Sequence, residues 1–208
     1  MMRLAGSNLA CVRGGRQVFR NLSFALGAGE ALVVTGPNGV GKSSLLRLIA
    51  GLVRPDQGRL EFEGGDPELT IGEHAHYLGH QDALKSSLSV HENLAFWANF
   101  LGGETAKGDA ALAAVGLDGL ARLPASYLSA GQRRRLSLAR LIAVDRPIWL
   151  LDEPTTALDT PGQSMLAELM SAHLARNGLI LAAAHGPIGL DWAKELRLGQ
   201  QAAGKSPS

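Results

Sequence analysis

A short segment of this sequence combines glycine, lysine and serine at a spacing that suits the binding of phosphate groups. It fits the pattern G-x-x-x-x-G-K-[ST] and reads Gly36, Pro37, Asn38, Gly39, Val40, Gly41, Lys42, Ser43. Its glycines let backbone N–H groups converge on an anion, because no Cβ blocks positive φ or close approach. Lys42 can reach the β- and γ-phosphates of a nucleotide, and the Ser43 hydroxyl can ligate Mg²⁺.

The elements around this segment decide between a phosphate loop and a glycine turn with an incidental lysine. An apolar run at 31–35 predicts a strand before it, and residues 44–50 predict a helix after it. The helix adds unpaired N–H groups and the positive end of its dipole. Strand, glycine turn and helix together predict a nucleoside triphosphate site.

Two further apolar runs end in residues that can act on a phosphate. The run 147–151 predicts a central strand and is followed by Asp152 and Glu153. Because ligands of α/β sheets lie beyond the carboxyl ends of the strands, Asp152 is placed to hold Mg²⁺ and Glu153 to polarise an attacking water. A second strand at 179–184 delivers His185, for which we expect a role in sensing the γ-phosphate. Two acids that merely start a loop are the weaker alternative.

A second anion site is predicted at the start of a later helix. Ser129 stands at the N-cap position of a helix that continues to Ala143, and the N–H groups of such a helix start can hold an anion. Three consecutive arginines at 133–135 could indicate a nucleic-acid patch. Successive positions on a helix point in different directions, so solvated or phosphate-facing side chains are predicted instead.

Composition excludes several function classes. The chain has 208 residues, enough for one domain with a sizeable core, and its net charge of +1 gives no sign of a nucleic-acid partner. A single cysteine, Cys11, has no internal disulfide partner and indicates a reducing compartment. No apolar run approaches the roughly 20 residues of a membrane span, and the N-terminus does not resemble a secretory signal. We therefore expect a cytosolic polypeptide.

The remaining segments predict flanking elements. Turns at 14–15 and 27–29 break residues 4–35 into short strands, and residues 59–63 alternate as a further strand, so an antiparallel β patch is expected. His74 and His76 would share one face of a strand at 74–78, with His80 nearby. A metal or haem site is one interpretation, and ordinary polar histidines are the favoured one.

The segment from 82 to 134 has a helical pattern. Ser89 can cap a helix, and a second amphipathic stretch covers 105–115. The apolar face of the first helix would carry Val90, Leu94, Trp97 and Leu101. Phe96, Trp97 and Phe100 predict core packing, with an outward docking patch as the alternative. A further helix is predicted from Asp159 to about Arg176.

With these residues in place, the chain resembles the ATP-binding-cassette ATPases over about residues 4–198. The matching segments, in the order of that family, are the Walker A loop 36–43, the Q-loop Gln81, the signature 128–132, the Walker B strand 148–152, the catalytic Glu153, the D-loop 157–159 and the switch His185. The resemblance implies one α/β domain, 1–208, of the P-loop NTPase type with a RecA-like core. It also implies an antiparallel β subdomain with the core (about 1–80 and 135–198), an inserted α-helical subdomain (about 82–134) and a tail (200–208).

The resemblance further implies ATP and Mg²⁺ as ligands, and a homodimer in which two copies pair head to tail. ATP would contact the Walker A residues together with Ser44 and Arg13, while Ser43, Gln81 and Asp152 would hold Mg²⁺. Glu153, His185 and Gln81 would be catalytic. The second copy would contribute Ser129, Ala130, Gly131, Gln132 and Asp159 in trans.

Two positions depart from the family pattern. Many members place an aromatic residue on adenine where this chain has Arg13, and because arginine also stacks on a base, we expect adenine binding with looser base selectivity. Ala130 stands in the signature where glycine is commoner. Its added methyl group is expected to matter little.

Segments 77–85, 92–97 and 183–187 are similar to the ATPase subunit of the cytochrome c maturation haem exporters. That resemblance implies integral-membrane partner subunits, a peripheral location on the cytoplasmic face of the bacterial inner membrane, and a role in supplying haem to cytochromes c. Whether haem is moved, or a loaded haem chaperone is released, stays open. The alternatives are the ATPase subunit of another transporter and a soluble ATP switch in DNA repair or translation, which usually carries a second cassette, a coiled coil or zinc ligands.

Overall fold

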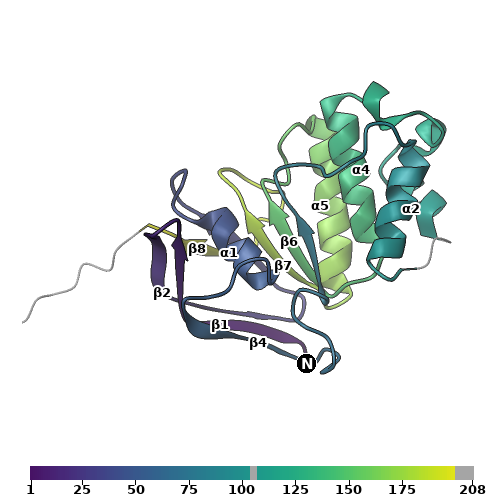
Figure 1. Cartoon of the computed structure of the whole chain (residues 1–208). Helices are drawn as coiled ribbons and strands as arrows, with labels where there is room; N and C mark the ends of the chain where they lie inside the picture. The colour runs from purple at the N-terminus through teal and green to yellow at the C-terminus, as the bar shows by residue number, and fades with distance from the viewer. Residues whose placement is uncertain (104–106, 200–208) are drawn as a thin grey trace, which may run out of the picture.

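Two β-sheets organise the computed structural model, which describes residues 1–103 and 107–199 (Figure 1). The smaller sheet is antiparallel, with the order β2-β1-β4, and consists of β1 (Arg3–Arg13), β2 (Arg16–Gly27) and β4 (Gln57–Glu63). The expected antiparallel patch is present. The prediction of short strands within 4–35 was wrong for β1 and β2. These are two long strands of one hairpin, and their pairing has register shifts near Leu9.

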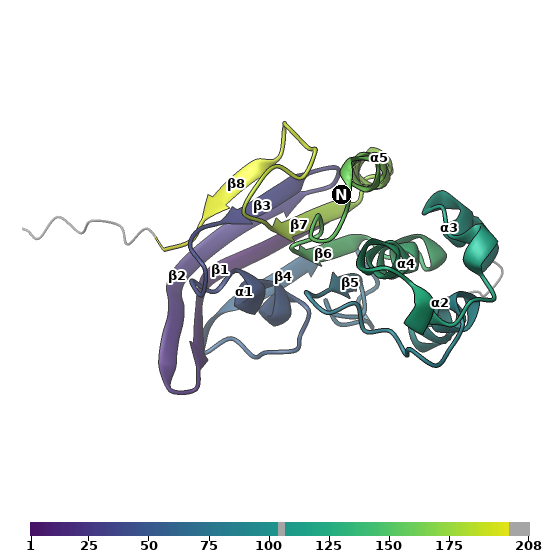
Figure 2. The same cartoon turned by 90° about the horizontal axis from the view of Figure 1, so that it is seen from above.

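The larger sheet is parallel, with the order β5-β6-β7-β3-β8, which Figure 2 shows strand by strand. Its strands are β3 (Ala31–Thr35), β5 (Ala75–Leu78), β6 (Ile148–Asp152), β7 (Leu179–Ala183) and β8 (Lys194–Arg197). Strand β8 was not predicted, because its short polar sequence forms an edge strand that only its pairing with β3 defines. Strand β7 lies between β3 and β6, so the carboxyl ends of these three strands meet at one edge.

Helix α1 (Lys42–Ile49) packs between the two sheets (Figure 1). Its buried leucines share a core cluster with Leu4 of β1 and with Ile148 and Leu150 of β6. The alternate residues of β6, Trp149 and Leu151, belong to a second cluster that includes α4 (Ala130–Ala143) and α5 (Thr160–Ala175). All of β6 is buried, as expected for a central strand covered on both faces.

The remaining helices gather beside α4. They are α2 (Val90–Phe100), α3 (Gly108–Ala114) and the 3₁₀ turns η2 (Asp118–Leu120) and η3 (Ala125–Tyr127). The predicted cap is confirmed, since Ser89 and Glu92 form a reciprocal capping box. Of the stretch predicted at 105–115, residues 105 and 106 lie outside the described part, as does the predicted tail 200–208. No helix among the described residues is long and apolar enough to cross a membrane.

The aromatic residues of α2 differ in how far they are exposed. Trp97 is partly buried, donates its indole N–H to the Ala83 carbonyl at 3.0 Å and stacks under the Arg140 guanidinium. Phe96 and Phe100 are exposed on the outside of the helix, by 42% and 71%. Ala83 and Arg140 therefore hold Trp97 beside the core clusters and not within them, and the outward patch consists of the two phenylalanines.

His74 and His76 are buried and each contacts a backbone carbonyl. His74 Nε2 lies 3.0 Å from the Asp66 oxygen, and His76 Nε2 lies 2.7 Å from the Val144 oxygen. Burial lowers the pKa of His76 to about 4, so its ring is neutral and donates to that carbonyl. Within residues 1–103 and 107–199, no group of three His, Cys, Asp or Glu side chains is arranged to hold a metal ion. These contacts support a structural role for both histidines.

Candidate nucleotide site

A cavity of about 590 Å³ opens where the carboxyl ends of β3, β7 and β6 meet. Its lining residues are Arg13, Val18, Asn38, Gly39, Gly41, Lys42, Ser43, Ser44, His80, Asp152, Glu153, Thr156 and His185. The hairpin β1–β2 contributes the first two of these residues. Asp152 is the last residue of β6, and the segments after β3, β5, β6 and β7 contribute the others. The cavity therefore lies at the place where α/β sheets bind their ligands.

The loop between β3 and α1 adopts a conformation that needs glycine. Gly36 and Gly41 have φ values of 134° and 113°, a region that residues with a Cβ rarely adopt. A Cβ at Gly36 would also lie 2.6 Å from the Leu198 carbonyl oxygen. Gly41 is the N-cap of α1, so the unpaired N–H groups of the first helical turn face the loop.

Lys42 directs its ammonium group back across the loop. Its Nζ donates to the carbonyl oxygens of Gly36 at 2.8 Å and Pro37 at 3.3 Å, and it lies 2.9 Å from Nε2 of His185. An ammonium has donors only, so His185 accepts through Nε2 and carries its proton on Nδ1. The same Nε2 lies 3.5 Å from Oε1 of Glu153. The meeting of the carboxyl ends of β3, β7 and β6 therefore places His185 between Lys42 and Glu153, within reach of both side chains.

Ser43 and Asp152 offer oxygen atoms of the kind that magnesium prefers. The Ser43 hydroxyl donates to Oδ1 of Asp152 at 2.9 Å, and Asp152 is buried at the end of β6. A hydroxyl beside a carboxylate, open to a cavity that also holds phosphate-binding groups, suits a hard divalent cation that keeps several waters. The residues present therefore fit Mg²⁺.

Glu153 sits in an unusual backbone conformation. Its φ is +49°, which is uncommon outside glycine and asparagine and costs about 1–2 kcal/mol. Its backbone N–H donates to the Ala183 carbonyl at 2.9 Å, which ties the turn after β6 to the end of β7. The carboxylate is three-quarters buried. Backbone strain that the surrounding structure holds in place is common at functional positions.

The cavity gathers most of the residues that the sequence predicted for it. Among the predicted positions, Gly36, Pro37 and Val40 belong to the loop but do not line the cavity, and neither does Gln81. His80 lines it instead, one position earlier than expected. The sequence reasoning also missed Val18 and Thr156. Val18 comes from β2, and nothing in its local pattern indicates that the hairpin reaches the phosphate loop.

A second cavity, of about 460 Å³, lies at the start of α4 and shares no lining residue with the first. It is lined by Gly116, Leu117, Ser129, Gly131, Gln132, Arg135, Ala157 and Asp159. Ser129 forms the predicted N-cap, again with a capping box, and its helix start faces this cavity. Ala130 does not line it. Four of the five residues predicted to act in trans are thus together, apart from the chain's own phosphate loop.

The three consecutive arginines behave differently from one another. Arg135 lines the second cavity and donates to Asp159 Oδ1 at 2.9 Å, a bond that lowers the pKa of that carboxyl. Arg134 is only 3% exposed and donates to backbone carbonyls. The prediction that these side chains are solvated or phosphate-facing was therefore wrong for Arg134, because four of its five acceptors are main-chain oxygens that the sequence does not reveal.

Comparison with known families agrees with this geometry. The family model described as ABC transporter matches residues 19–156, which include the phosphate loop, the start of α4 and Glu153. The chain belongs to the ABC transporter family. It is an ABC ATPase, and the expected α/β fold with a parallel and an antiparallel sheet is confirmed by its solved neighbours.

Curated relatives of this ABC ATPase are similar along nearly their whole length. A protein of Rhodopseudomonas palustris strain BisB18 is 65% identical over 95% of this chain and 98% of its own, and one of Nitrobacter winogradskyi is 62% identical with the same coverage. Both are named cytochrome c biogenesis ATP-binding export protein CcmA. Among solved structures, a putative ABC transporter ATP-binding protein of Pyrococcus furiosus has a TM-score of 0.81 at 23% identity, covering 94% of this chain and 97% of its own.

Proposed function

We propose that this chain is the ATPase subunit of a membrane complex that exports haem for cytochrome c biogenesis. The observation that carries the proposal is the 61–65% identity, over almost the full length, to proteins named for ATP-binding export in cytochrome c biogenesis. The membrane subunits choose the cargo in this proposal, since no residue in either cavity is specific for haem. Another transporter's ATPase subunit and a soluble ATP switch are less favoured, because the near-full-length relatives described above are named for cytochrome c biogenesis.

The phosphate chemistry follows from the residues of the first cavity. The loop amides and Lys42 bind the phosphates, and Arg13 offers a guanidinium to stack on the base. Ser43 and Asp152 would hold Mg²⁺, with Gln81 completing the site, and the bound ion would neutralise charge on the β- and γ-phosphates. Glu153 orients and polarises the attacking water, while His185 accepts a hydrogen bond or donates one near the γ-phosphate.

We also propose a head-to-tail homodimer. The two cavities share no lining residue, and each holds some of the groups that a phosphoryl transfer needs. Pairing two copies would place Ser129, Gly131 and Gln132 of one copy over the phosphate loop of the other. Hydrolysis then depends on closure, and closure supplies the mechanical output to membrane partners. In this assembly residues 1–208 act as one domain, peripheral on the cytoplasmic face of the inner membrane.

Deletion of the gene, followed by complementation, tests the proposal. We expect the deletion to abolish covalent haem in c-type cytochromes, measured by haem staining of membrane fractions. The parent gene should restore the stain and Glu153→Gln should not. Co-purification from membranes should recover integral-membrane subunits together with the chain. Normal c-type cytochromes in the deletion strain would overturn the assignment to haem export and leave the ATPase to another transporter.

A further inference from the structure

One buried guanidinium connects the turn that carries Glu153 to the segment that carries Gln81. Arg134 lies on α4, close to the N-cap Ser129, and only 3% of its side chain is exposed. A guanidinium has five N–H donors, and this one has five acceptors. They are the carbonyl oxygens of Pro154 (3.3 Å from Nε), Gly79 (3.0 Å from Nη1), Asp152 (3.0 Å from Nη2) and Glu153 (2.8 Å from Nη2), and Oδ1 of Asp82 (3.3 Å from Nη1).

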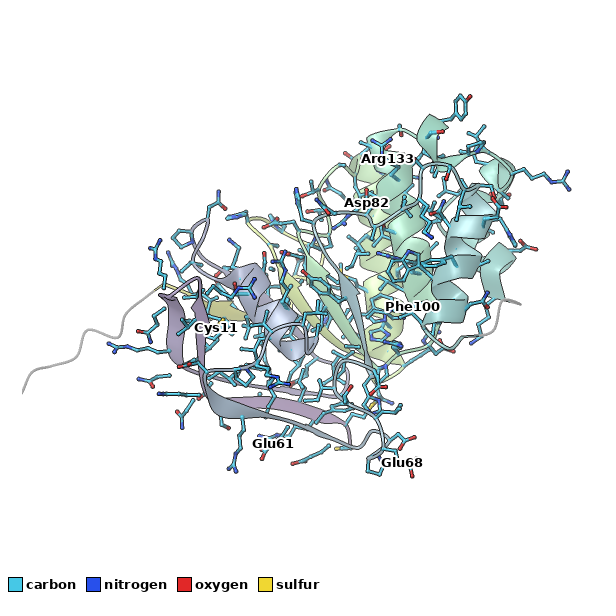
Figure 3. All side chains as sticks on the ribbon, in the orientation of Figure 1. Cys11, Glu61, Glu68, Asp82, Phe100 and Arg133 are labelled. Carbon is cyan, nitrogen blue, oxygen red and sulfur yellow. The ribbon has the colours of Figure 1, made fainter. Side chains whose placement is uncertain are left out.

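These acceptors fall into two groups that are far apart in the sequence. Three carbonyls belong to residues 152–154, where β6 ends and the turn begins. The other two acceptors, on Gly79 and Asp82, flank Gln81 in the segment after β5. Ser137, one turn further along α4, donates its hydroxyl to the Asp82 carbonyl at 2.9 Å and adds a second link to that segment. Figure 3 shows Asp82 near the N-terminal part of α4, where Arg133 is labelled.

The turn at Glu153 needs such support. Its φ of +49° is unfavourable for glutamate, so neighbouring groups must hold it in place. The Glu153 N–H donates to the Ala183 carbonyl. Arg134 donates to the carbonyl of Glu153 and to those of the residues before and after it. The direction of the Glu153 carboxylate therefore depends on an arginine that does not line the nucleotide cavity.

We propose that Arg134 is a positioning residue for hydrolysis, which fixes the backbone of Glu153 and couples it to the Gln81 segment. The inference rests on the proposed function, because it takes Glu153 as the group that orients water. Helix α4 begins at the cavity proposed to receive the ATP of a second copy. The helix that closes on the partner's nucleotide thus also holds the chain's own water-orienting residue.

Replacement by lysine separates the donor pattern from the positive charge. Lysine keeps the charge but concentrates three donors on one nitrogen, so it cannot serve both groups of acceptors. In the full chain, we expect Arg134→Lys to lower kcat by about 10- to 100-fold through misplacement of Glu153. KM and the affinity for a fluorescent ATP analogue should stay within about twofold, because Arg134 lies outside the cavity. Arg176→Lys, at an exposed arginine that lines neither of the two cavities, is the matched control and should keep the parent's kcat.

Two further measurements distinguish positioning from a general loss of structure. In a Glu153→Gln background, Arg134→Lys should cause no further loss of turnover, since both changes remove the same function. In Arg134→Ala, low concentrations of guanidinium chloride should restore turnover more than equal concentrations of ammonium chloride. Variants are compared at equal folded fraction by circular dichroism.

The outcomes separate this inference from the proposed function. Parent-like turnover of Arg134→Lys beside an impaired Glu153→Gln overturns the inference alone. Parallel loss of ATP affinity and turnover, or additive losses in the double variant, also overturns it, because either indicates a purely structural role. Parent-like turnover of Glu153→Gln overturns the proposed role of Glu153, and the inference falls with it.

Discussion

Nζ of Lys42 lies 2.9 Å from Nε2 of His185, although the two residues are 143 positions apart in the chain. The contact arises because β7, which ends before His185, is hydrogen-bonded to β3, which ends before the phosphate loop. On its other side β7 pairs with β6, so Glu153 lies within 3.5 Å of the same imidazole nitrogen. One histidine therefore contacts both the ammonium proposed to bind phosphate and the carboxylate proposed to orient water.

Lys42→Ala is expected to remove most of the ATP affinity. The ammonium is the main cation of the phosphate loop, and hydrogen bonds to a charged group contribute about 1.5–3 kcal/mol each, so we expect the Kd to rise by about 100-fold or more. Equilibrium titration with a fluorescent ATP analogue measures it. Lys194→Ala, an exposed lysine on β8, is the control and should bind as the parent does. Unchanged affinity of Lys42→Ala would place the nucleotide elsewhere.

Glu153→Gln is expected to separate binding from hydrolysis. The amide keeps the size of the side chain but cannot accept the proton of the attacking water, so turnover should fall by about 10²- to 10⁴-fold. ATP binding should persist, and a closed dimer should accumulate. Steady-state phosphate release measures the first effect and size-exclusion chromatography with ATP the second. Full turnover would mean that another residue orients the water.

His185→Ala is expected to slow hydrolysis with a small effect on binding. Lys42 keeps its contacts with the loop carbonyls in this variant, so the phosphate-binding cation stays in place. Loss of the imidazole removes a polar group next to Glu153 and should lower kcat by about 10²- to 10³-fold. Comparison of kcat with the ATP Kd measures both. A large loss of affinity at unchanged kcat would show that His185 acts through Lys42 alone.

The local patterns of the sequence predicted the parts of the site that a single strand, turn or helix positions. Lys42, Ser43, Asp152 and His185 each follow an apolar run, and the carboxyl ends of parallel strands meet at one edge, so their meeting could be expected. The caps Ser129 and Asp159 were also predictable, because N-capping is a local interaction.

Interactions with backbone oxygens could not be predicted in this way. The five acceptors of Arg134 include four carbonyls, which every residue carries and which leave no pattern in the sequence. Arg134 therefore looked like a surface residue between two other arginines. The edge strand β8 and the reach of Val18 to the cavity depend likewise on pairing between distant segments. Tertiary contacts determine these features, and a local sequence pattern does not show which distant segments come into contact.

Mixing two inactive variants tests the head-to-tail pairing. Lys42→Ala disables the phosphate loop, and Gly131→Asp places a negative charge in the second cavity, which should repel the partner's ATP. Each variant alone should hydrolyse ATP poorly. A mixed dimer, however, contains one site built from the intact phosphate loop of one copy and the intact α4 start of the other. Phosphate release should therefore reappear on mixing, and its complete absence at any ratio would contradict a shared site.

Acid should destabilise the fold through His76 and His173. Burial lowers the pKa of each to about 4, whereas histidine in an unfolded chain titrates near 6.5. Above about pH 6.5 both states are neutral and the full stability is present. As the pH falls toward about 4, each of these histidines is protonated in the unfolded chain but stays neutral in the folded chain. The free energy of unfolding therefore drops by about 1.4 kcal/mol per pH unit for each histidine. Urea unfolding between about pH 7.5 and 5 measures this slope.

His76→Gln identifies the source of that slope. Glutamine keeps an N–H donor for the Val144 carbonyl but does not titrate, so the pH dependence of the unfolding free energy should fall by about half. His91→Gln, which replaces a half-exposed histidine by the same amide, is the matched control. An equal slope in His76→Gln and in the parent would mean that other groups, such as the paired carboxylates, cause the loss of stability in acid.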